Sequence, residues 1–185
     1  MSTARERVVP KQEVQRISDP LRPEPSKIPA ENGLAFARAY ARLSEAISHH
    51  AGYTLVTGPA GVGKTALVRQ VLAEAPVSKA VFASPSTHTP GQIARELAGI
   101  GERADGGRLR RALVTRVERA KVTGRPLVVI VDDAHTADLG WLDAVRLTLE
   151  AGPDASEWIR LILVGRPALI EMLGRPQARG LWTRV

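Results

Sequence analysis

The sequence predicts an α/β fold in which helices cover both faces of a parallel sheet. Four short apolar runs alternate with longer segments that have helical periodicity. The third run, residues 127–131, is apolar at every position, as expected of a strand covered on both faces. A glycine-rich segment joins the first run to the next helix, at the strand end where such sheets bind ligands. These observations favour one α/β domain.

The chain divides into a predicted tail, residues 1–30, and a predicted core, residues 31–185. The tail lacks hydrophobic periodicity and contains five prolines, so we expect an extended or flexible segment. A length of 185 residues with 44% hydrophobic content allows one well-buried core but not two large domains.

Composition excludes several kinds of chemistry. The chain has no cysteine, which excludes disulfides, thiolate metal sites and thiol nucleophiles. No segment resembles a signal peptide, and no apolar stretch approaches the length of a membrane span. We therefore expect a cytoplasmic protein without a membrane partner.

The elements are predicted in order from periodicity and from start signals. Spacing of apolar residues predicts a first helix from Leu34 to about His49. Thr89, Pro90 and Gln92 form a capping signal for a later helix. The predicted strands are residues 53–57, 79–83, 127–131 and 159–164, and the further helices are 66–75, 90–98, 108–122, 139–150 and 167–173.

Residues 58–65 read GPAGVGKT and fit the pattern G-x-x-x-x-G-K-[ST] between a strand and a helix. The glycines allow the loop to fold back so that backbone N–H groups point at phosphate oxygens, and the helix adds the positive end of its dipole. Lys64 then reaches the β- and γ-phosphates, and the Thr65 hydroxyl is a ligand for Mg²⁺. The expected nucleotide-binding residues are Gly58, Pro59, Ala60, Gly61, Val62, Gly63, Lys64, Thr65 and Ala66.

An acidic pair, Asp132 and Asp133, follows the buried run at residues 127–131. Two carboxylates at the end of a buried strand are costly unless a cation or solvent faces them. In a protein with a phosphate-binding loop, Asp132 is expected to hold Mg²⁺, and Asp133 to orient and deprotonate the attacking water. A turn or a helix cap is the alternative for such a pair.

The net charge of +7 is concentrated in two parts of the chain. Residues 102–125 contain eight basic and three acidic side chains, and residues 160–185 contain five arginines and one glutamate. An acidic stretch, residues 132–157, separates them. This pattern indicates an anionic partner such as nucleic acid, although arginine-rich helix faces can also be merely solvated.

The order of these motifs, with LILVGRPAL at residues 161–169 and RPQAR at residues 175–179, resembles AAA+ ATPases of the ExeA and TniB kind. The resemblance runs from about Leu34 to the C-terminus. As it implies, that group includes secretion-associated ATPases and ATPase regulators of bacterial DNA transposition, relatives of MuB. It implies a P-loop NTPase fold that binds ATP and Mg²⁺, and a homo-oligomer assembled through the nucleotide interface. DNA and a partner protein such as a transposase are its implied partners.

The chain departs from this family in three ways. Asp133 stands where glutamate is usual, and its side chain is one methylene shorter, which bears on water positioning and on the rate of hydrolysis. Arg166 stands where glutamine is usual, and it either contacts the γ-phosphate as a catalytic group or lies on the surface. The chain ends about where a fifth strand would begin, so we expect no helical lid. Arg179 and Arg184 lie where such families place an arginine finger, although each is as readily an ordinary exposed arginine.

The leading hypothesis is an ATP-hydrolysing AAA+ module that regulates a DNA transaction, such as transposition, through ATP-dependent assembly. The alternative is a signalling switch of the STAND type, with slight turnover, in which an Asp-Asp pair is more usual. A third hypothesis is a scaffold that binds ATP without hydrolysing it.

Overall fold

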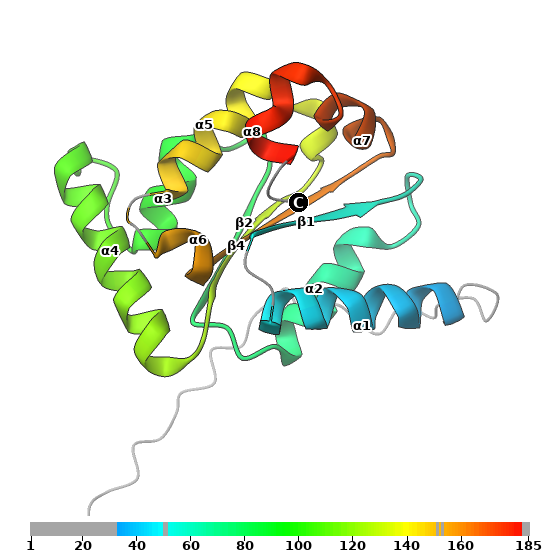
Figure 1. Ribbon diagram of the computed structural model, residues 1–185, viewed down its shortest axis with the longest axis horizontal. Coiled ribbons are helices and arrows are strands. Elements are labelled where there is room, and N and C mark those ends of the chain that lie inside the picture. Colours follow the sequence, from blue (N-terminus) through cyan, green and yellow to red (C-terminus); the bar gives the residue numbers. More distant parts are fainter. Residues whose placement is uncertain (1–32, 50–51, 151, 153, 183–185) are drawn as a thin grey trace, which may run out of the picture.

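The computed structural model describes residues 33–49, 52–150, 152 and 154–182. The predicted tail at residues 1–30 lies outside the described residues. Sheet and helices form the layered α/β arrangement that the sequence predicts (Figure 1).

A single four-stranded parallel sheet forms the centre of the fold. Its strand order is β1-β4-β3-β2, so the last strand in the sequence lies between the first and the third. The strands are β1 (Gly52–Thr57), β2 (Lys79–Ala83), β3 (Leu127–Val131) and β4 (Ile159–Gly165), which confirms the four predicted runs to within one residue at each end.

The register brings the carboxyl ends of the strands to one edge of the sheet. Thr57, the last residue of β1, lies opposite Gly165, the last residue of β4. Ala83 at the end of β2 lies opposite Val131 at the end of β3. The segments that follow these strands therefore emerge side by side, where parallel sheets bind ligands.

Burial differs between the strands according to their place in the sheet. Every residue of β3 and β4 is buried, because both strands have neighbours on both sides and helices on both faces. In β1, at the edge of the sheet, all six residues are only partly buried.

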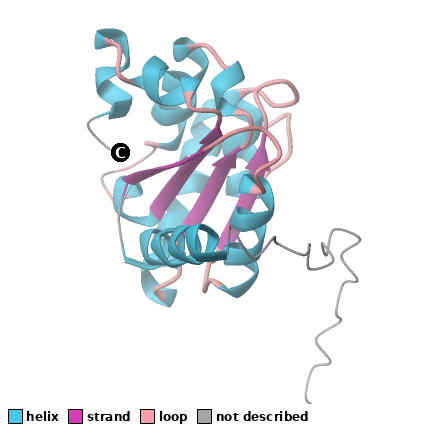
Figure 2. Cartoon of the chain, turned by 90° about the vertical axis from the view of Figure 1, so that its right-hand side faces the viewer, coloured by secondary structure: helices cyan, strands magenta, loops and turns pink. Residues whose placement is uncertain are grey.

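Helices cover both faces of the sheet (Figure 2). Val128 and Ile162 pack on one face with buried residues of the first two helices, and Val129 and Leu161 pack on the other face with the later helices. The first group is α1 (Gly33–His49) and α2 (Lys64–Glu74), and the second is α3 (Pro90–Ala98), α4 (Gly106–Thr123), α5 (Leu139–Leu149), α6 (Ala155–Trp158), α7 (Ala168–Leu173) and α8 (Arg179–Trp182), with the 3₁₀ turns η2 (Ala134–Thr136) and η3 (Pro176–Ala178).

The helix starts follow from capping side chains. Thr89 and Gln92 form a complete capping box at the start of α3, as predicted. Asp105 accepts a hydrogen bond from the backbone N–H of Arg108, so α4 begins at Gly106, two residues earlier than predicted. Because α6 and α8 are each one turn long, apolar periodicity does not predict them.

None of the helices in the part of the chain that the structure describes is both long and apolar enough to cross a membrane.

We expect Leu113→Ala to lower the free energy of unfolding by about 2–5 kcal/mol, since it leaves a cavity under α4 where the side chain is 1% exposed. Leu147→Ala on α5 is the matched control, because that side chain is 56% exposed and its removal should change stability by about 0.5 kcal/mol or less. Urea unfolding followed by circular dichroism measures both values. Equal losses in the two variants would contradict the assignment of the core.

Candidate nucleotide-binding site

The glycine-rich loop connects β1 to α2, and two of its residues have a backbone conformation that glycine adopts more readily than other residues. Gly61 and Gly63 have φ angles of 75° and 92°, in the left-handed region. The backbone N–H of Leu67 donates to the carbonyl of Gly63 over 2.9 Å, so α2 starts directly at the end of the loop. The free N–H groups of this helix start therefore lie beside the loop, which is an arrangement that binds phosphate.

The Lys64 side chain folds back over the loop. Its ammonium nitrogen donates to the carbonyl oxygens of Gly58, at 3.0 Å, and of Pro59, at 2.8 Å. These two bonds hold the positive charge over the loop, where it could reach a phosphate that the loop's N–H groups would bind.

Thr65 and Asp132 are 67 residues apart in the sequence and in contact in the structure. The Thr65 hydroxyl donates to Oδ2 of Asp132 over 2.8 Å, and Oδ1 of Asp132 accepts the backbone N–H of Asp133 over 2.9 Å. A hydroxyl and a carboxylate are the hard oxygen donors that Mg²⁺ prefers. This donor pair fits the predicted metal site.

Asp133 has a left-handed backbone, with φ of 51°. Aspartate adopts this conformation more readily than most residues other than glycine. The side chain is 69% exposed, and its Oδ1 lies 4.0 Å from Nδ1 of His135. A carboxylate that reaches solvent at the edge of the site can meet a water molecule, as the predicted role requires.

His135 lies against the site with most of its side chain buried. The side chain is 14% exposed, and within the described residues its buried Nδ1 has no hydrogen-bond partner. In the described part of the chain, the Asp133 carboxylate is the acidic group within ion-pair distance of this ring, at 4.0 Å. His135 therefore lies beside the acidic pair.

Gly165 is a site residue that the sequence reasoning missed. Its carbonyl accepts the backbone N–H of Gly58 over 3.3 Å, which joins the end of β4 to the start of the loop. A Cβ at this position would lie 3.3 Å from the backbone nitrogen of His135 and 3.1 Å from a methyl carbon of Leu169. A side chain would thus require His135 or Leu169 to shift by a few tenths of an ångström. A glycine at the end of a buried strand was the available signal.

The loop after β2 was also missed. The backbone N–H of Asp132 donates to the carbonyl of Ala83 over 2.8 Å, which places this loop beside the acidic pair. Trp141 holds its far end through a 3.3 Å hydrogen bond from Nε1 to the carbonyl of His88. The Ser84 and Ser86 hydroxyls are 3.0 Å apart. The run of hydroxyl residues after a strand could have indicated this polar loop.

The arginines that the sequence predicted to contact the nucleotide do not join the acidic pair in the structure. Arg166 directly follows β4 and is exposed, and among these described residues it forms no hydrogen bond or ion pair with Lys64, Asp132 or Asp133. Arg179 lies exposed at the start of α8. Arg184 lies outside the described residues.

A phosphate-binding loop, a Thr–Asp oxygen pair and an acidic pair at the carboxyl edge of a parallel sheet define a P-loop NTPase fold. The chain belongs to a family described as an AAA domain, which matches residues 47–173, more than half of its length.

Three known proteins are similar to this chain. General secretion pathway protein A of Aeromonas hydrophila is 29% identical over 153 residues, which cover 80% of this chain and 28% of that protein. Cdc6p of Pyrobaculum aerophilum has a similar structure, with a TM-score of 0.57, 20% identity, and coverage of 85% of this chain and 45% of that chain. The ORC1 protein of Aeropyrum pernix, solved in complex with DNA, has a TM-score of 0.56, 18% identity and the same coverage.

These comparisons confirm the AAA+ fold and relate the chain to a secretion pathway protein, in line with the ExeA part of the predicted resemblance. The chain spans less than half the length of these relatives. The TniB and MuB part of the predicted resemblance remains a prediction, and so does the expected absence of a lid.

We expect Thr65→Val to lower the affinity for ATP in the presence of Mg²⁺ by about tenfold, since it removes a hydroxyl that bonds to a charged group at 2.8 Å. Binding without Mg²⁺ should change little, because the loop backbone is unaltered. Titration of a fluorescent ATP analogue with and without Mg²⁺ measures the difference. Thr148→Val, which removes a hydroxyl bonded within α5, is the control. An equal loss without Mg²⁺ would argue against a metal role.

The left-handed backbone of Asp133 leads to a prediction about stability. Asp133→Val should lower the free energy of unfolding by about 1–2 kcal/mol, since a β-branched residue is strained in the left-handed region. Asp133→Asn should remain close to wild type, because asparagine tolerates this region. Chemical denaturation distinguishes the two, and equal stability of both variants would show that the left-handed conformation imposes no constraint.

Proposed function

We propose that this chain is an AAA+ module that binds Mg²⁺-ATP, hydrolyses it slowly and regulates a DNA transaction such as transposition. The observation that carries this proposal is the 2.8 Å hydrogen bond between Thr65 and Asp132, behind a loop with two left-handed glycines. That geometry supports binding of a triphosphate with its metal rather than of a simple anion.

In the proposed binding mode, the loop backbone from Gly58 to Ala66 and the Lys64 ammonium hold the β- and γ-phosphates. Thr65 and Asp132 hold Mg²⁺, which neutralises phosphate charge when it is bound. The ammonium would exchange its two carbonyl acceptors, on Gly58 and Pro59, for phosphate oxygens.

For hydrolysis, Asp133 is the proposed base. Its exposed carboxylate would orient a water molecule and accept its proton, and the shorter side chain than glutamate supports slow turnover. Arg166 follows β4 at the same edge of the sheet, and its guanidinium would stabilise negative charge on the γ-phosphate.

Regulation is proposed to act through assembly. AAA+ family membership supports a homo-oligomer formed through the nucleotide interface, with Arg179 or Arg184 acting across it. The fold shared with an ORC1 protein that was solved on DNA, together with the basic charge of the chain, supports DNA as a partner. A transposase is the proposed protein partner.

A switch of the STAND type is the second candidate. The side chain at Asp133 supports it, because a short carboxylate that is 69% exposed is a poorly held base. In that function the nucleotide state sets the conformation and turnover is slight. A scaffold that binds ATP and has lost its base would likewise be insensitive to Asp133→Asn.

We expect Lys64→Ala to lower ATP affinity by about 10- to 100-fold, since charge-assisted hydrogen bonds contribute about 1.5–3 kcal/mol. Asp133→Asn should keep ATP binding and lower turnover by about 100-fold or more. Phosphate release, with and without DNA at one protein concentration, measures turnover. Lys79→Ala is the control, because it changes a lysine at the amino end of β2, away from the loop.

Three outcomes separate the candidates. Larger oligomers and tighter, salt-sensitive DNA binding with ATP than with ADP support the regulator. Binding without turnover, unaffected by Asp133→Asn, favours the switch or the scaffold. Turnover that survives Lys64→Ala would show that the activity came from another protein and would sink the proposal.

A further inference from the structure

The exposed side of α4 carries a row of arginines. Arg108, Arg111 and Arg119 are all exposed, and at 100° per residue they fall on one side of the helix. The opposite side is the buried one that packs into the core, with Leu109, Leu113, Val117 and Ala120. We call Arg108, Arg111 and Arg119 the α4 arginine row.

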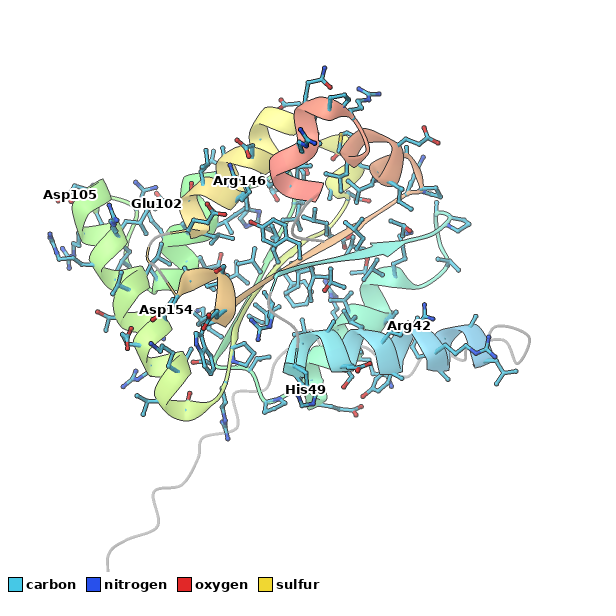
Figure 3. The ribbon with its side chains drawn as sticks, viewed as in Figure 1. Arg42, His49, Glu102, Asp105, Arg146 and Asp154 are labelled. Atoms are coloured by element: carbon cyan, nitrogen blue, oxygen red, sulfur yellow. The ribbon has the colours of Figure 1, made fainter. Side chains whose placement is uncertain are left out.

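Within the described residues, no member of the α4 arginine row lies within ion-pair distance of a carboxylate. Two acids close to this helix surface, Glu118 and Asp154, pair with a lysine instead of with the row. Lys121 of α4 lies 2.6 Å from Asp154, which is labelled in Figure 3, and 3.7 Å from Glu118. Its single positive charge offsets only one of these two carboxylates, so the pair keeps one net negative charge beside the three positive charges of the row.

Asp105 offsets part of the charge at the first turn only. Its carboxylate caps α4 through the Arg108 N–H, and this hydrogen bond, together with the charges of Arg111 and Arg108, lowers its pKa. Arg119 lies about three turns further along, beyond its influence. An anion is therefore attracted along the side of α4 rather than to its capped N-terminus.

The α4 arginine row lies apart from the nucleotide loop. In Figure 1, α4 forms one flank of the molecule, and the loop between β1 and α2 lies at the other. A ligand on the row therefore does not compete with ATP.

We propose that the α4 arginine row binds the phosphate backbone of double-stranded nucleic acid. This inference rests on the proposed function and assigns its DNA contact to one surface. Arg119 follows Arg108 by eleven positions, about 16.5 Å along the helix, which matches about five phosphate spacings of one strand at about 3.4 Å each along the duplex axis. Arginine forks match phosphate oxygens, and α4 has no aromatic residue of the kind that anchors protein interfaces.

The test compares two double variants of the full chain that lose the same charge. Arg111→Gln/Arg119→Gln alters the row, and Arg38→Gln/Arg42→Gln alters exposed arginines on α1, on the other side of the sheet. Fluorescence anisotropy with a labelled 30-base-pair duplex, ATP and Mg²⁺ gives the affinity between 50 and 200 mM salt. We expect the row variant to bind about 100-fold more weakly at 0.1 M salt, with a salt slope reduced by about 2, and the α1 variant to change little.

Two controls separate loss of the surface from loss of the fold. ATP affinity should be unchanged in both double variants, and Arg111→Lys/Arg119→Lys should keep most of the salt slope, since the charges remain. Retained DNA binding in the lysine variant and its loss in the glutamine variant support the surface.

Other outcomes overturn the assignment. If DNA affinity falls equally in the two glutamine variants, or does not fall in the row variant, another surface binds the DNA. That result would contradict this inference but not the proposed function. Displacement of the duplex by polyglutamate as readily as by unlabelled duplex assigns the row to an acidic polypeptide instead. Failure of the wild-type chain to bind DNA in ATP overturns this inference and the DNA part of the proposed function together, while ATP turnover tests the remainder.

Discussion

Gly165 lies where three segments of the chain meet at the carboxyl edge of the sheet. Because β4 runs between β1 and β3, the loop after β1 reaches the acidic segment after β3 only across the end of β4. Gly165 accepts the backbone N–H of Gly58, and a side chain on it would crowd the backbone of His135. The hydrogen bond that joins Thr65 to Asp132 lies at this same edge of the sheet, since both residues belong to segments that follow the two strands neighbouring β4. A residue without a side chain at this point thus suits the convergence of the two segments that carry Thr65 and Asp132.

Local patterns predicted the parts of this fold that depend on local physics. The apolar run of β3, the cap at Thr89 and the phosphate-binding loop each carry their cause within a few residues. Strand order has no such signal, so the position of β4 between β1 and β3, and with it the role of Gly165, could not be read from the sequence. Counting charges along the sequence was limited in the same way, because it does not show which side chains are exposed. Arg160 contributes to a basic segment of the sequence, yet it lies buried in β4, where burial lowers its pKa.

Charge is balanced within the fold in some places and left open in others. Arg146 on α5 contacts Asp143 at 2.7 Å and Glu150 at 3.1 Å, and these acids raise its pKa. It lies beside Gly180 of α8, so this ion-pair group also joins two helices (Figure 3). Within the described residues, the three arginines of the α4 row, Arg108, Arg111 and Arg119, form no such ion pair. An arginine that is paired with two acids supports packing, whereas arginines without an ion pair keep more of their field for a ligand.

β1 carries the nucleotide loop and is also the least buried strand of the sheet. In the described part of the chain it pairs with β4 alone, and all six of its residues are partly exposed. Backbone amides on its open side should therefore exchange with solvent deuterium faster than those of β3, whose strand is paired on both sides. A ligand that binds the folded loop stabilises the strand that holds it. Amide exchange in β1 should therefore slow when a ligand occupies the site. Comparing the exchange rate with and without the ligand would report site occupancy in the intact protein, without a fluorescent label.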